Sequence, residues 1–336
     1  MSRRISSPGR RFGLALSMMA CAAFVMTVGV PALAADESFP TKPIRLIIPY
    51  SPGGGADNTS RTVAAKMSEL LGQNVVVENR PGASGTLAES LVAQAPADGY
   101  TLLYDTFAFS INASLRKLSF DPIQALQPVS LVATAAMIFA VHPSVPATDL
   151  NGFIAHARAN PGKLTYASFG MGSSAHLATE WLSGAADINM LHVPYKGGAP
   201  ALVDLVGGQV DAYFANASSG LPHVRSGKLR ALAVSSADRL NTLPDVPTVR
   251  ESGIADFEVL DWHGIFLPRA TPPAIVERVA RAIREATADP ATAQRLLDMG
   301  IQPAKLHQTP ASFDTFIKGQ MQRWTKLVKD RNIPLE

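Results

Sequence analysis

Short apolar runs alternate with segments of helical periodicity along the chain, and this alternation restricts the fold more than any other feature of the sequence. Strand-length apolar runs separated by amphipathic helical segments are typical of α/β folds, in which helices cover the faces of a sheet. We therefore predict an α/β fold. The runs expected to form strands are 44–48, 74–78, 101–104, 131–141, 163–168, 190–195, 210–215, 229–235 and 263–268.

Helical periodicity is clear in 57–71 and in the C-terminal third of the chain. Two threonine–proline pairs, Thr271-Pro272 and Thr309-Pro310, predict helix starts with Thr as the N-cap and Pro as the first helical residue. We interpret these C-terminal helices as scaffold.

The first 34 residues have the pattern of a secretory signal peptide. Four arginines precede a long apolar run, which is followed by Ala-Leu-Ala at 32–34, and the segment contains no acidic residue. We expect cleavage near Ala34-Ala35, with Cys21 inside the removed segment. The exported protein would then contain no cysteine and no disulfide.

Charge argues against one class of partner. The formal net charge of the chain is +3, and removing the four leader arginines gives +3 − 4 = −1. A near-neutral chain has no basic footprint for nucleic acid, so we expect no nucleic-acid partner.

Three loops rich in glycine and small polar residues follow predicted strands and precede predicted helices. They are 51–57 (SPGGGAD), 79–86 (NRPGASGT) and 168–176 (SFGMGSSAH). Glycine lets the backbone approach a ligand closely and leaves N–H groups unpaired at a helix start. The positive end of the helix dipole adds attraction for an anion. These loops therefore predict binding of a carboxylate or a phosphate.

Phosphate and dinucleotide motifs do not fit in detail. Gly55 is followed by Ala56-Asp57, whereas a Walker A loop ends in Gly-Lys-Ser/Thr. The segment 170–175 matches the looser dinucleotide pattern, but no acidic residue ends a convincing strand about twenty positions later. We expect no cofactor.

Catalytic and metal-binding patterns are weak. His176 and Glu180 share a helix face, but no third ligand follows at useful spacing, so no metal is predicted. One alternative remains open, an exported hydrolase or isomerase that uses His176 with Ser173 or Ser174. A nucleophile needs a base and an orienting group, and the sequence offers no third member, so we expect no enzyme activity.

Five segments, in this order and spacing, carry a resemblance to a known family: PTKPIRLIIPYSPGGGADNTSR, VVVENRPGASGTLAESLVAQAPADGYTLLY, HVPYKGGAPALVDLVGGQVDAYFAN, GKLRALAVSSADRLNTLPDVPTVRESG and WHGIFLPRATPPAIVERVARAI. With them the chain resembles the extracytoplasmic solute-binding receptors of tripartite tricarboxylate transporters, the Bug family. The resemblance covers almost all of the exported chain.

The resemblance implies a two-lobed periplasmic binding protein fold of type II-like form, each lobe a sheet flanked by helices, with the ligand in the cleft between the lobes. The expected division is 36–136 with 258–336 as domain 1 and 137–257 as domain 2, with a hinge near Met137 and Val259. It further implies a periplasmic monomer that delivers a small organic carboxylate to a membrane permease. Sensing in place of transport stays open as an alternative.

The resemblance also implies a site. In the family, two facing loops grip the carboxylate, and these loops correspond to 51–57 and 168–174 here. In the segment YDTFAFS, where many relatives carry small polar residues, this chain has Phe107. This departure leaves room for an aromatic or longer aliphatic acid as the ligand. The ligand-binding residues expected in this way are Ser51, Gly54, Gly55, Ala56, Asp57, Ser84, Thr106, Phe107, Ser168, Gly170, Met171, Ser173, Ser174, His176, Tyr195, Lys196 and Asn216.

Overall fold

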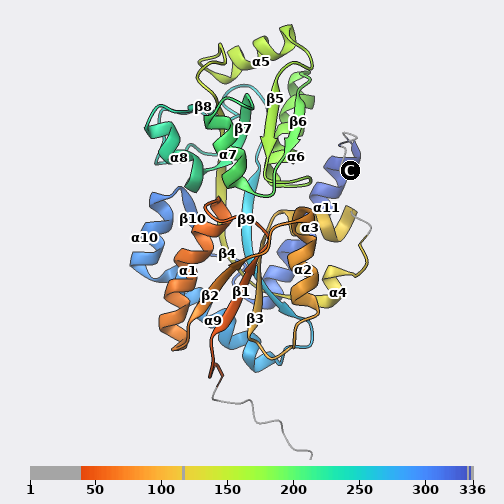
Figure 1. Cartoon of the computed structure of the whole chain (residues 1–336), viewed down its shortest axis with the longest axis vertical. Helices are drawn as coiled ribbons and strands as arrows, with labels where there is room; N and C mark the ends of the chain where they lie inside the picture. Colours follow the sequence, from red (N-terminus) through yellow and green to blue (C-terminus); the bar gives the residue numbers. More distant parts are fainter. Residues whose placement is uncertain (1–38, 116–117, 331–332, 334–336) are drawn as a thin grey trace, which may run out of the picture. The chain divides into compact units, whose positions relative to one another are not determined.

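Strands and helices alternate as expected. The computed structural model describes residues 39–115, 118–330 and 333, which belong to one compact unit spanning 38–336 (Figure 1). The strands are β1 (Ile44–Ile48), β2 (Val75–Asn79), β3 (Thr101–Thr106), β4 (Leu126–Val141), β5 (Thr165–Ser168), β6 (Leu191–Pro194), β7 (Ala212–Asn216), β8 (Arg230–Val234), β9 (Leu260–Pro268) and β10 (Ile301–Pro303). The helices are α1 (Gly55–Leu71), the 3-10 turn η1 (Ala83–Gly85), α2 (Thr86–Ala93), α3 (Ala108–Leu115), α4 (Pro122–Ala125), α5 (Leu150–Ala159), α6 (Ser174–Ala186), α7 (Gly198–Val206), α8 (Ala217–Arg225), α9 (Pro273–Ala288), α10 (Pro290–Asp298) and α11 (Pro310–Asp330).

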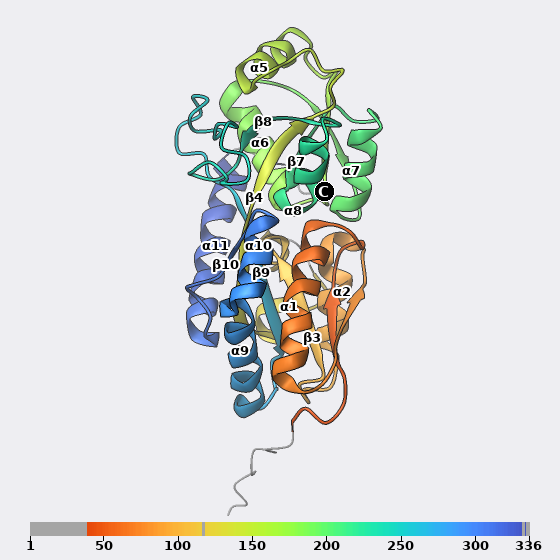
Figure 2. The ribbon, with the colours of Figure 1, turned by 90° about the vertical axis from the view of Figure 1, so that its left-hand side faces the viewer.

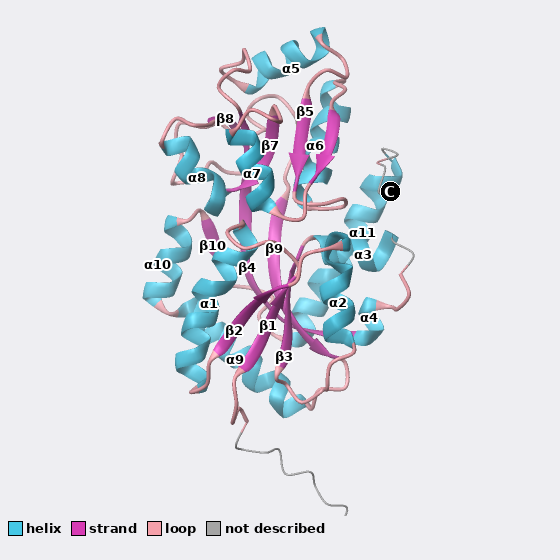
Figure 3. Ribbon diagram, in the orientation of Figure 1, coloured by secondary structure: helices cyan, strands magenta, loops and turns pink. Residues whose placement is uncertain are grey.

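All nine expected strands are present, so the predicted α/β class is confirmed (Figure 3). The short strand β10, which pairs with β4, had no clear sequence signal. Thr309 receives the N–H of Ser312 at the start of α11, which confirms that cap. The cap expected at Thr271 is wrong. Helix α9 begins one residue later, at Pro273, with the extended Pro272 as its N-cap.

The strands form one path in the order β2-β1-β3-β9-β4-β7-β5-β6. Strands β1, β2 and β3 run parallel, and so do β5, β6 and β7, whereas β9 and β4 are antiparallel to their neighbours. Parallel strands place their carboxyl ends at one edge of the sheet, where ligands of open α/β folds bind. The two parallel sets are therefore the places to look for a site.

The long strand β4 joins the two parallel sets. Its part up to Ala136 pairs with β9, and its part from Met137 onward pairs with β7 and β8. Ser235, just after β8, lies at the same point: its hydroxyl accepts the N–H of Met137 at 2.9 Å and donates to the carbonyl of Val259 at 2.6 Å. Three passages of the chain are thus joined at one buried serine.

Helices flank the strands on both sides. Figure 1 shows α1 and α10 on the left of β1–β3 and α2 and α3 on the right, and Figure 2 shows α1, α9 and α10 from the left-hand side. Helix α1 buries Val63, Ala64 and Met67, and it ends at Gly72 in the left-handed conformation (φ 68°). Helix α11 buries Phe313, Ile317 and Trp324. None of the helices within 39–115 and 118–330 is long and apolar enough to span a lipid bilayer.

Candidate ligand-binding site

Three helices at the carboxyl ends of parallel strands begin at glycines. Helix α1 follows β1 and is capped by Gly54, α2 follows β2 and is capped by Gly85, and α7 follows β6 and is capped by Gly197. A glycine has no side chain to accept the first N–H groups of its helix, so the positive end of the dipole and the N–H groups without a backbone partner are available to a ligand. In α2 the first N–H, that of Thr86, already donates to the carbonyl of Ala83. In contrast, α5, α6, α8 and α10 receive a cap from their own Asp149, Ser173, Asn216 and Asp289.

The glycine starts surround two adjoining pockets. The inner pocket measures about 20 Å³ as the volume open to the centre of a water molecule, and the outer pocket about 210 Å³. The rings of Tyr50 and Phe169, which meet edge to face with centroids 6.0 Å apart, line both pockets. The inner pocket is further lined by Gly54, Gly55, Ala56, Gly198, Tyr213, Asn216 and Asp261. The outer pocket is further lined by Pro49, Gly82, Ala83, Ser84, Gly85, Gly170, Met171, Pro194, Tyr195 and Lys196.

Residues on opposite sides of the pockets are in direct contact through the glycine loops. The N–H and the hydroxyl of Ser51 both donate to the carbonyl of Lys196, at 3.3 and 2.9 Å. A Cβ on Gly197 (φ +140°) would lie 2.8 Å from the nitrogen of Ser51, and a Cβ on Gly55 would overlap the side chain of Asn216. Glycine is required at these two positions because any side chain would push the walls apart.

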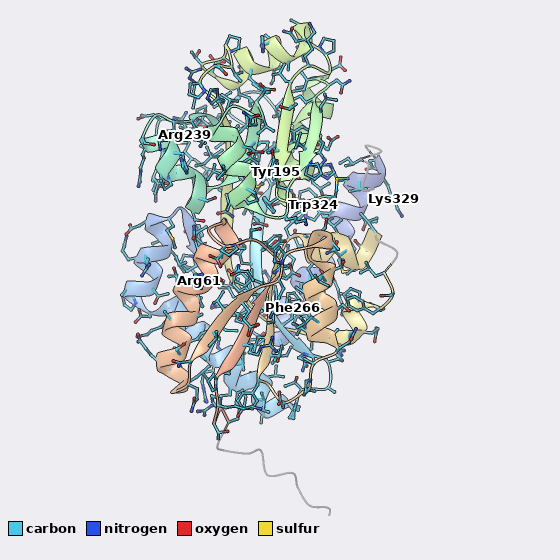
Figure 4. All side chains as sticks on the ribbon, viewed as in Figure 1. Arg61, Tyr195, Arg239, Phe266, Trp324 and Lys329 are labelled. Atoms are coloured by element: carbon cyan, nitrogen blue, oxygen red, sulfur yellow. The ribbon has the colours of Figure 1, made fainter. Side chains whose placement is uncertain are left out.

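Asp57 holds the first glycine loop rather than lining a pocket. Its carboxylate accepts the N–H of Gly53 at 2.9 Å, the guanidinium of Arg61 at 3.0 Å and the amide of Asn79 at 2.9 Å. Arg61 is labelled on α1 in Figure 4. Burial by itself would raise the pKa of the Asp57 carboxyl, but these hydrogen bonds outweigh burial and hold the pKa below its usual range.

A buried polar chain supports the floor of the inner pocket. Tyr104 hydroxyl lies 2.8 Å from Nδ1 of His263, and Nε2 of His263 lies 3.2 Å from Oδ2 of Asp261. Burial, followed by the charge of Asp261, raises the pKa of the Tyr104 phenol well above its usual range, so Tyr104 keeps its proton and can donate to Nδ1. The tautomer of His263 with its proton on Nε2 then donates to Asp261.

A second buried carboxyl group lies near the outer pocket. Burial, followed by the charge of Glu89, raises the pKa of Asp105 well above its usual range. The amide of Asn112 donates both to Glu89 Oε1 at 2.7 Å and to the carbonyl of Ser84 at 2.9 Å. This cluster therefore holds η1, which lines the outer pocket.

The residues of the alternative catalytic pairing, His176 with Ser173 or Ser174, make hydrogen bonds that fit structural roles. The hydroxyl of Ser173 accepts the backbone N–H of His176, Ser174 points its hydroxyl at the sulfur of Met137, and Nδ1 of His176 accepts the N–H of Gly172. A different pair exists: the Ser168 hydroxyl lies 2.7 Å from Nε2 of His192. Burial lowers the pKa of His192 to about 4, and its ring stacks on those of His176 and Tyr166.

The expected site residues divide into two groups. Those that line a pocket are Gly54, Gly55, Ala56, Ser84, Gly170, Met171, Tyr195, Lys196 and Asn216. Those outside both linings are Ser51, Asp57, Thr106, Phe107, Ser168, Ser173, Ser174 and His176. Thr106 supports Tyr50, since the two hydroxyls lie 2.7 Å apart, whereas Phe107 packs in the core against Trp324 on α11 with ring centroids 4.6 Å apart. Trp324 is labelled in Figure 4.

Sequence reasoning did not single out four side chains that line the pockets: Tyr50, Phe169, Tyr213 and Asp261. Tyr50 and Phe169 lie within or next to the glycine loops, so their position was a usable signal. Tyr213 and Asp261 lie on strands β7 and β9 and had no such signal. Among residues 39–115, 118–330 and 333, no group of three His, Cys, Asp or Glu side chains is placed to hold a metal ion.

Comparisons with known proteins agree on one family. A sequence model described as tripartite tricarboxylate transporter family receptor matches residues 59–333. The chain is 36% identical to protein BugT of Bordetella pertussis over 318 residues, which cover 93% of this chain and 96% of BugT. The solved periplasmic binding protein BugD is 34% identical with a TM-score of 0.85, and it covers 88% of this chain and 99% of its own.

A third relative was solved with a ligand. MatC from Rhodopseudomonas palustris, with bound malate, is 31% identical with a TM-score of 0.82 over 86% of this chain and 100% of its own. The structural agreement confirms the expected α/β fold of periplasmic binding proteins, with helices flanking the sheet.

Proposed function

Because the chain belongs to the tripartite tricarboxylate transporter receptor family, the Bug family of solute-binding receptors, we propose that it captures a small organic carboxylate in the inner and outer pockets and delivers it to a membrane permease. The bound malate of MatC is a carboxylate of this class.

One observation carries the carboxylate proposal: the glycine starts of α1, α2 and α7 all line the two pockets. Each start offers N–H groups and the positive end of a dipole, equivalent to about half a charge. Lys196 adds a positive charge at the outer pocket. An anion with several oxygens can use more than one of these starts at once.

We further propose that 36–136 with 258–336 and 137–257 move as two lobes about Met137, Ser235 and Val259. The glycine starts of α1 and α2 come from the first lobe and that of α7 from the second. A ligand held by both lobes binds the closed arrangement more tightly and shifts the balance toward it. The Ser51–Lys196 contact would then be one of the contacts made on closing.

We propose no catalysis for this site. Ser168 and His192 are close enough to form a nucleophile and base, but the Ser168 hydroxyl also faces the carbonyl of Gly170 at 3.1 Å, which fits a role in shaping the loop. A sensing receptor would differ from a transport receptor only in its membrane partner. Measuring ligand uptake by a strain that lacks the gene distinguishes the two, because only a transport receptor is needed for uptake.

The proposal also covers the cellular location and the oligomeric state of the protein. We propose a periplasmic monomer released by cleavage near Ala34-Ala35. That cleavage site lies outside the residues that the structure describes. Mass measurement of the exported protein tests the cleavage site, and light scattering tests the monomer.

The full chain, expressed for export, purified, unfolded and refolded to remove bound ligand, provides the test. We expect at least one organic acid among mono-, di- and tricarboxylates, aromatic acids and amino acids to raise the melting temperature. A ligand at a hundred times its Kd adds about 2.7 kcal/mol of stability. Calorimetry should confirm binding, with no product formed.

A matched pair of variants locates the site. Gly54 lines the inner pocket, and a Cβ there would reach to 3.4 Å from the nitrogen of Gly198 and occupy space at the start of α1 that the ligand needs. Gly54→Ala should therefore weaken binding, whereas Gly319→Ala on α11 meets no atom within 4 Å in the described residues and should not. Equal affinity for both variants, or no binding of any acid by the wild-type protein, contradicts the proposal.

A further inference from the structure

Helix α11 runs alongside β4 (Figure 2), and its first half is anchored on the first lobe. There the ring of Phe313 meets those of Trp262 and Phe266 on β9, with centroids 5.8 and 5.4 Å apart. A Cβ on Gly264 would overlap the Phe313 ring, so the glycine lets this ring lie directly on the strand. The first half of α11 therefore belongs to the core of the first lobe.

The second half of α11 joins the two parallel sets of strands. The ring of Trp324 packs against Phe107, just after β3, with centroids 4.6 Å apart. It also meets the ring of Trp181 on α6 edge to face, with centroids 6.3 Å apart. Strand β3 is in the first parallel set, and α6 follows β5 in the second. The Trp181–Trp324 contact therefore connects a helix of the second lobe with a helix of the first.

Trp181 also contacts the chain passage that leads into β9. Its ring centroid lies 4.9 Å from that of Phe257, which is fully buried. In the next residue, the carbonyl of Glu258 accepts a hydrogen bond from the guanidinium of Arg323 on α11 at 2.9 Å. Trp181 and α11 thus meet beside Val259, one of the three residues about which we propose that the lobes move.

The two tryptophans lie outside the ligand site, since neither lines the inner or the outer pocket. Trp181 is only partly buried, whereas Trp324 is 1% exposed. Moving α6 away from α11 would therefore open the Trp324 ring to water, which is unfavourable for an apolar surface. An edge-to-face contact between aromatic rings changes an equilibrium constant by about two- to tenfold.

We propose that the Trp181–Trp324 contact stabilises the closed arrangement of the lobes before a ligand arrives. The two tryptophans are then positioning residues, which raise ligand affinity by increasing the closed fraction and do not touch the ligand. The proposal rests on the lobe movement proposed above and identifies a contact that sets its balance. It is separate from the Ser51–Lys196 contact, which lies between the glycine loops.

Double electron–electron resonance measures this balance in the refolded, ligand-free protein. Ala65→Cys on α1 and Val203→Cys on α7 place one spin label on each lobe, at exposed positions. The native Cys21 lies in the expected leader, so the full chain expressed for export carries only these two labels. We expect an open and a closed distance, and Trp181→Leu should lower the ratio of closed to open protein at least threefold. Trp181→Phe, which keeps a ring, should fall between the wild type and Trp181→Leu.

Phe316→Ala is the matched control. Like Trp181, Phe316 is a partly buried aromatic residue that packs against other rings. Its ring partners all belong to the first lobe: Trp262, His307 and Phe313. This variant should lower stability and leave the ratio of closed to open protein unchanged. If Trp181→Leu does not fold, Trp324→Phe weakens the same contact from α11 and should lower the ratio in the same way.

Calorimetry provides a readout that a purely structural role would not change. It is run with L-malate and with each acid of the panel that raises the melting temperature. Trp181→Leu should weaken binding of all these acids by one common factor of about threefold or more, because no contact to the ligand changes. Acids weakened to different extents would make Trp181 a ligand contact and overturn the inference.

The inference and the proposed function fail in different ways. An unchanged ratio in Trp181→Leu, or a wild type that is wholly open without ligand, overturns the role of the tryptophans and leaves the receptor proposal standing. A single distance that no variant and no acid alters overturns the lobe movement. Binding of no acid of any class overturns the receptor proposal itself.

Discussion

Single residues decide how closely the walls of the pockets can approach. Gly55 begins α1, which follows β1 in one parallel set, and Asn216 ends β7 in the other, yet a Cβ on Gly55 would overlap the Asn216 side chain. Asn216 in turn caps α8 and donates to Asp261. A substitution at Gly55 therefore disturbs both the N-cap of α8 and the hydrogen bond to Asp261 in the inner pocket.

Gly55→Ala should weaken ligand binding by about tenfold or more, because closing the walls would require Asn216 to leave its place. Stability should change by about 1–3 kcal/mol, in line with overpacking of a buried site. Calorimetry and urea unfolding measure the two effects. Gly319→Ala is the control, and wild-type affinity of Gly55→Ala would show that the walls do not meet in the bound protein.

Phe107 lies in the hydrophobic core, although the sequence predicted that it contacts the ligand. Its ring is fully buried against Trp324, outside both pockets. Phe107→Leu should lower the free energy of unfolding by about 1–2 kcal/mol while leaving ligand affinity unchanged. If affinity for an aromatic or long aliphatic acid fell with little loss of stability, Phe107 would be a ligand contact after all.

At the scale of elements, the crossing of three chain passages holds the two parallel sets together. β4 passes from one set to the other at Met137, β8 ends just before Ser235, and Val259 leads into β9. The Ser235 hydroxyl links the first and third of these passages.

Ser235→Ala should cost about 1–3 kcal/mol of stability, because it leaves the buried N–H of Met137 and the carbonyl of Val259 without their partner. Urea unfolding of the variant measures this loss. The control is Ser236→Ala, whose exposed hydroxyl donates to the carbonyl of Asp238 and should cost less than about 0.5 kcal/mol. Equal stability of the two variants would mean that water replaces the Ser235 contacts.

The whole molecule responds to pH through its buried groups. Burial lowers the pKa of His192 to about 4, below the ordinary histidine value of 6.5. A lowered pKa means that the unfolded chain binds a proton that the folded protein refuses. His192 therefore contributes stability that is present above about pH 6.5 and is lost as the pH falls toward 4.

His192→Gln removes this contribution, so the variant should lose less stability than the wild type between pH 7 and pH 5. Urea unfolding at both values measures the difference. His156→Gln, on the partly exposed face of α5, is the control and should follow the wild type. If His192→Gln and the wild type lost the same stability between pH 7 and pH 5, the histidine would be protonated without cost in the folded protein.

The sequence alone determined the elements and the chemistry of the loops. Strand lengths, helix periodicity and the glycine runs are local patterns, so they could be read without a structure. Gly54 and Gly55, which line the inner pocket, lie in a loop singled out in this way, whereas Lys196 was expected only from the family resemblance. Local patterns also predict that a glycine before a helix leaves N–H groups open, which is a property of the backbone.

Only the tertiary structure decided what stands opposite these loops. Asp261 and Tyr213 reach the inner pocket because β9 lies between β3 and β4 and β7 pairs with the far part of β4. The tertiary structure also places Phe107 in the core outside both pocket linings, because α11 packs its Trp324 against that ring. Pairing between strands far apart in the chain follows from burial summed over the whole sheet, and no local spacing of residues encodes it.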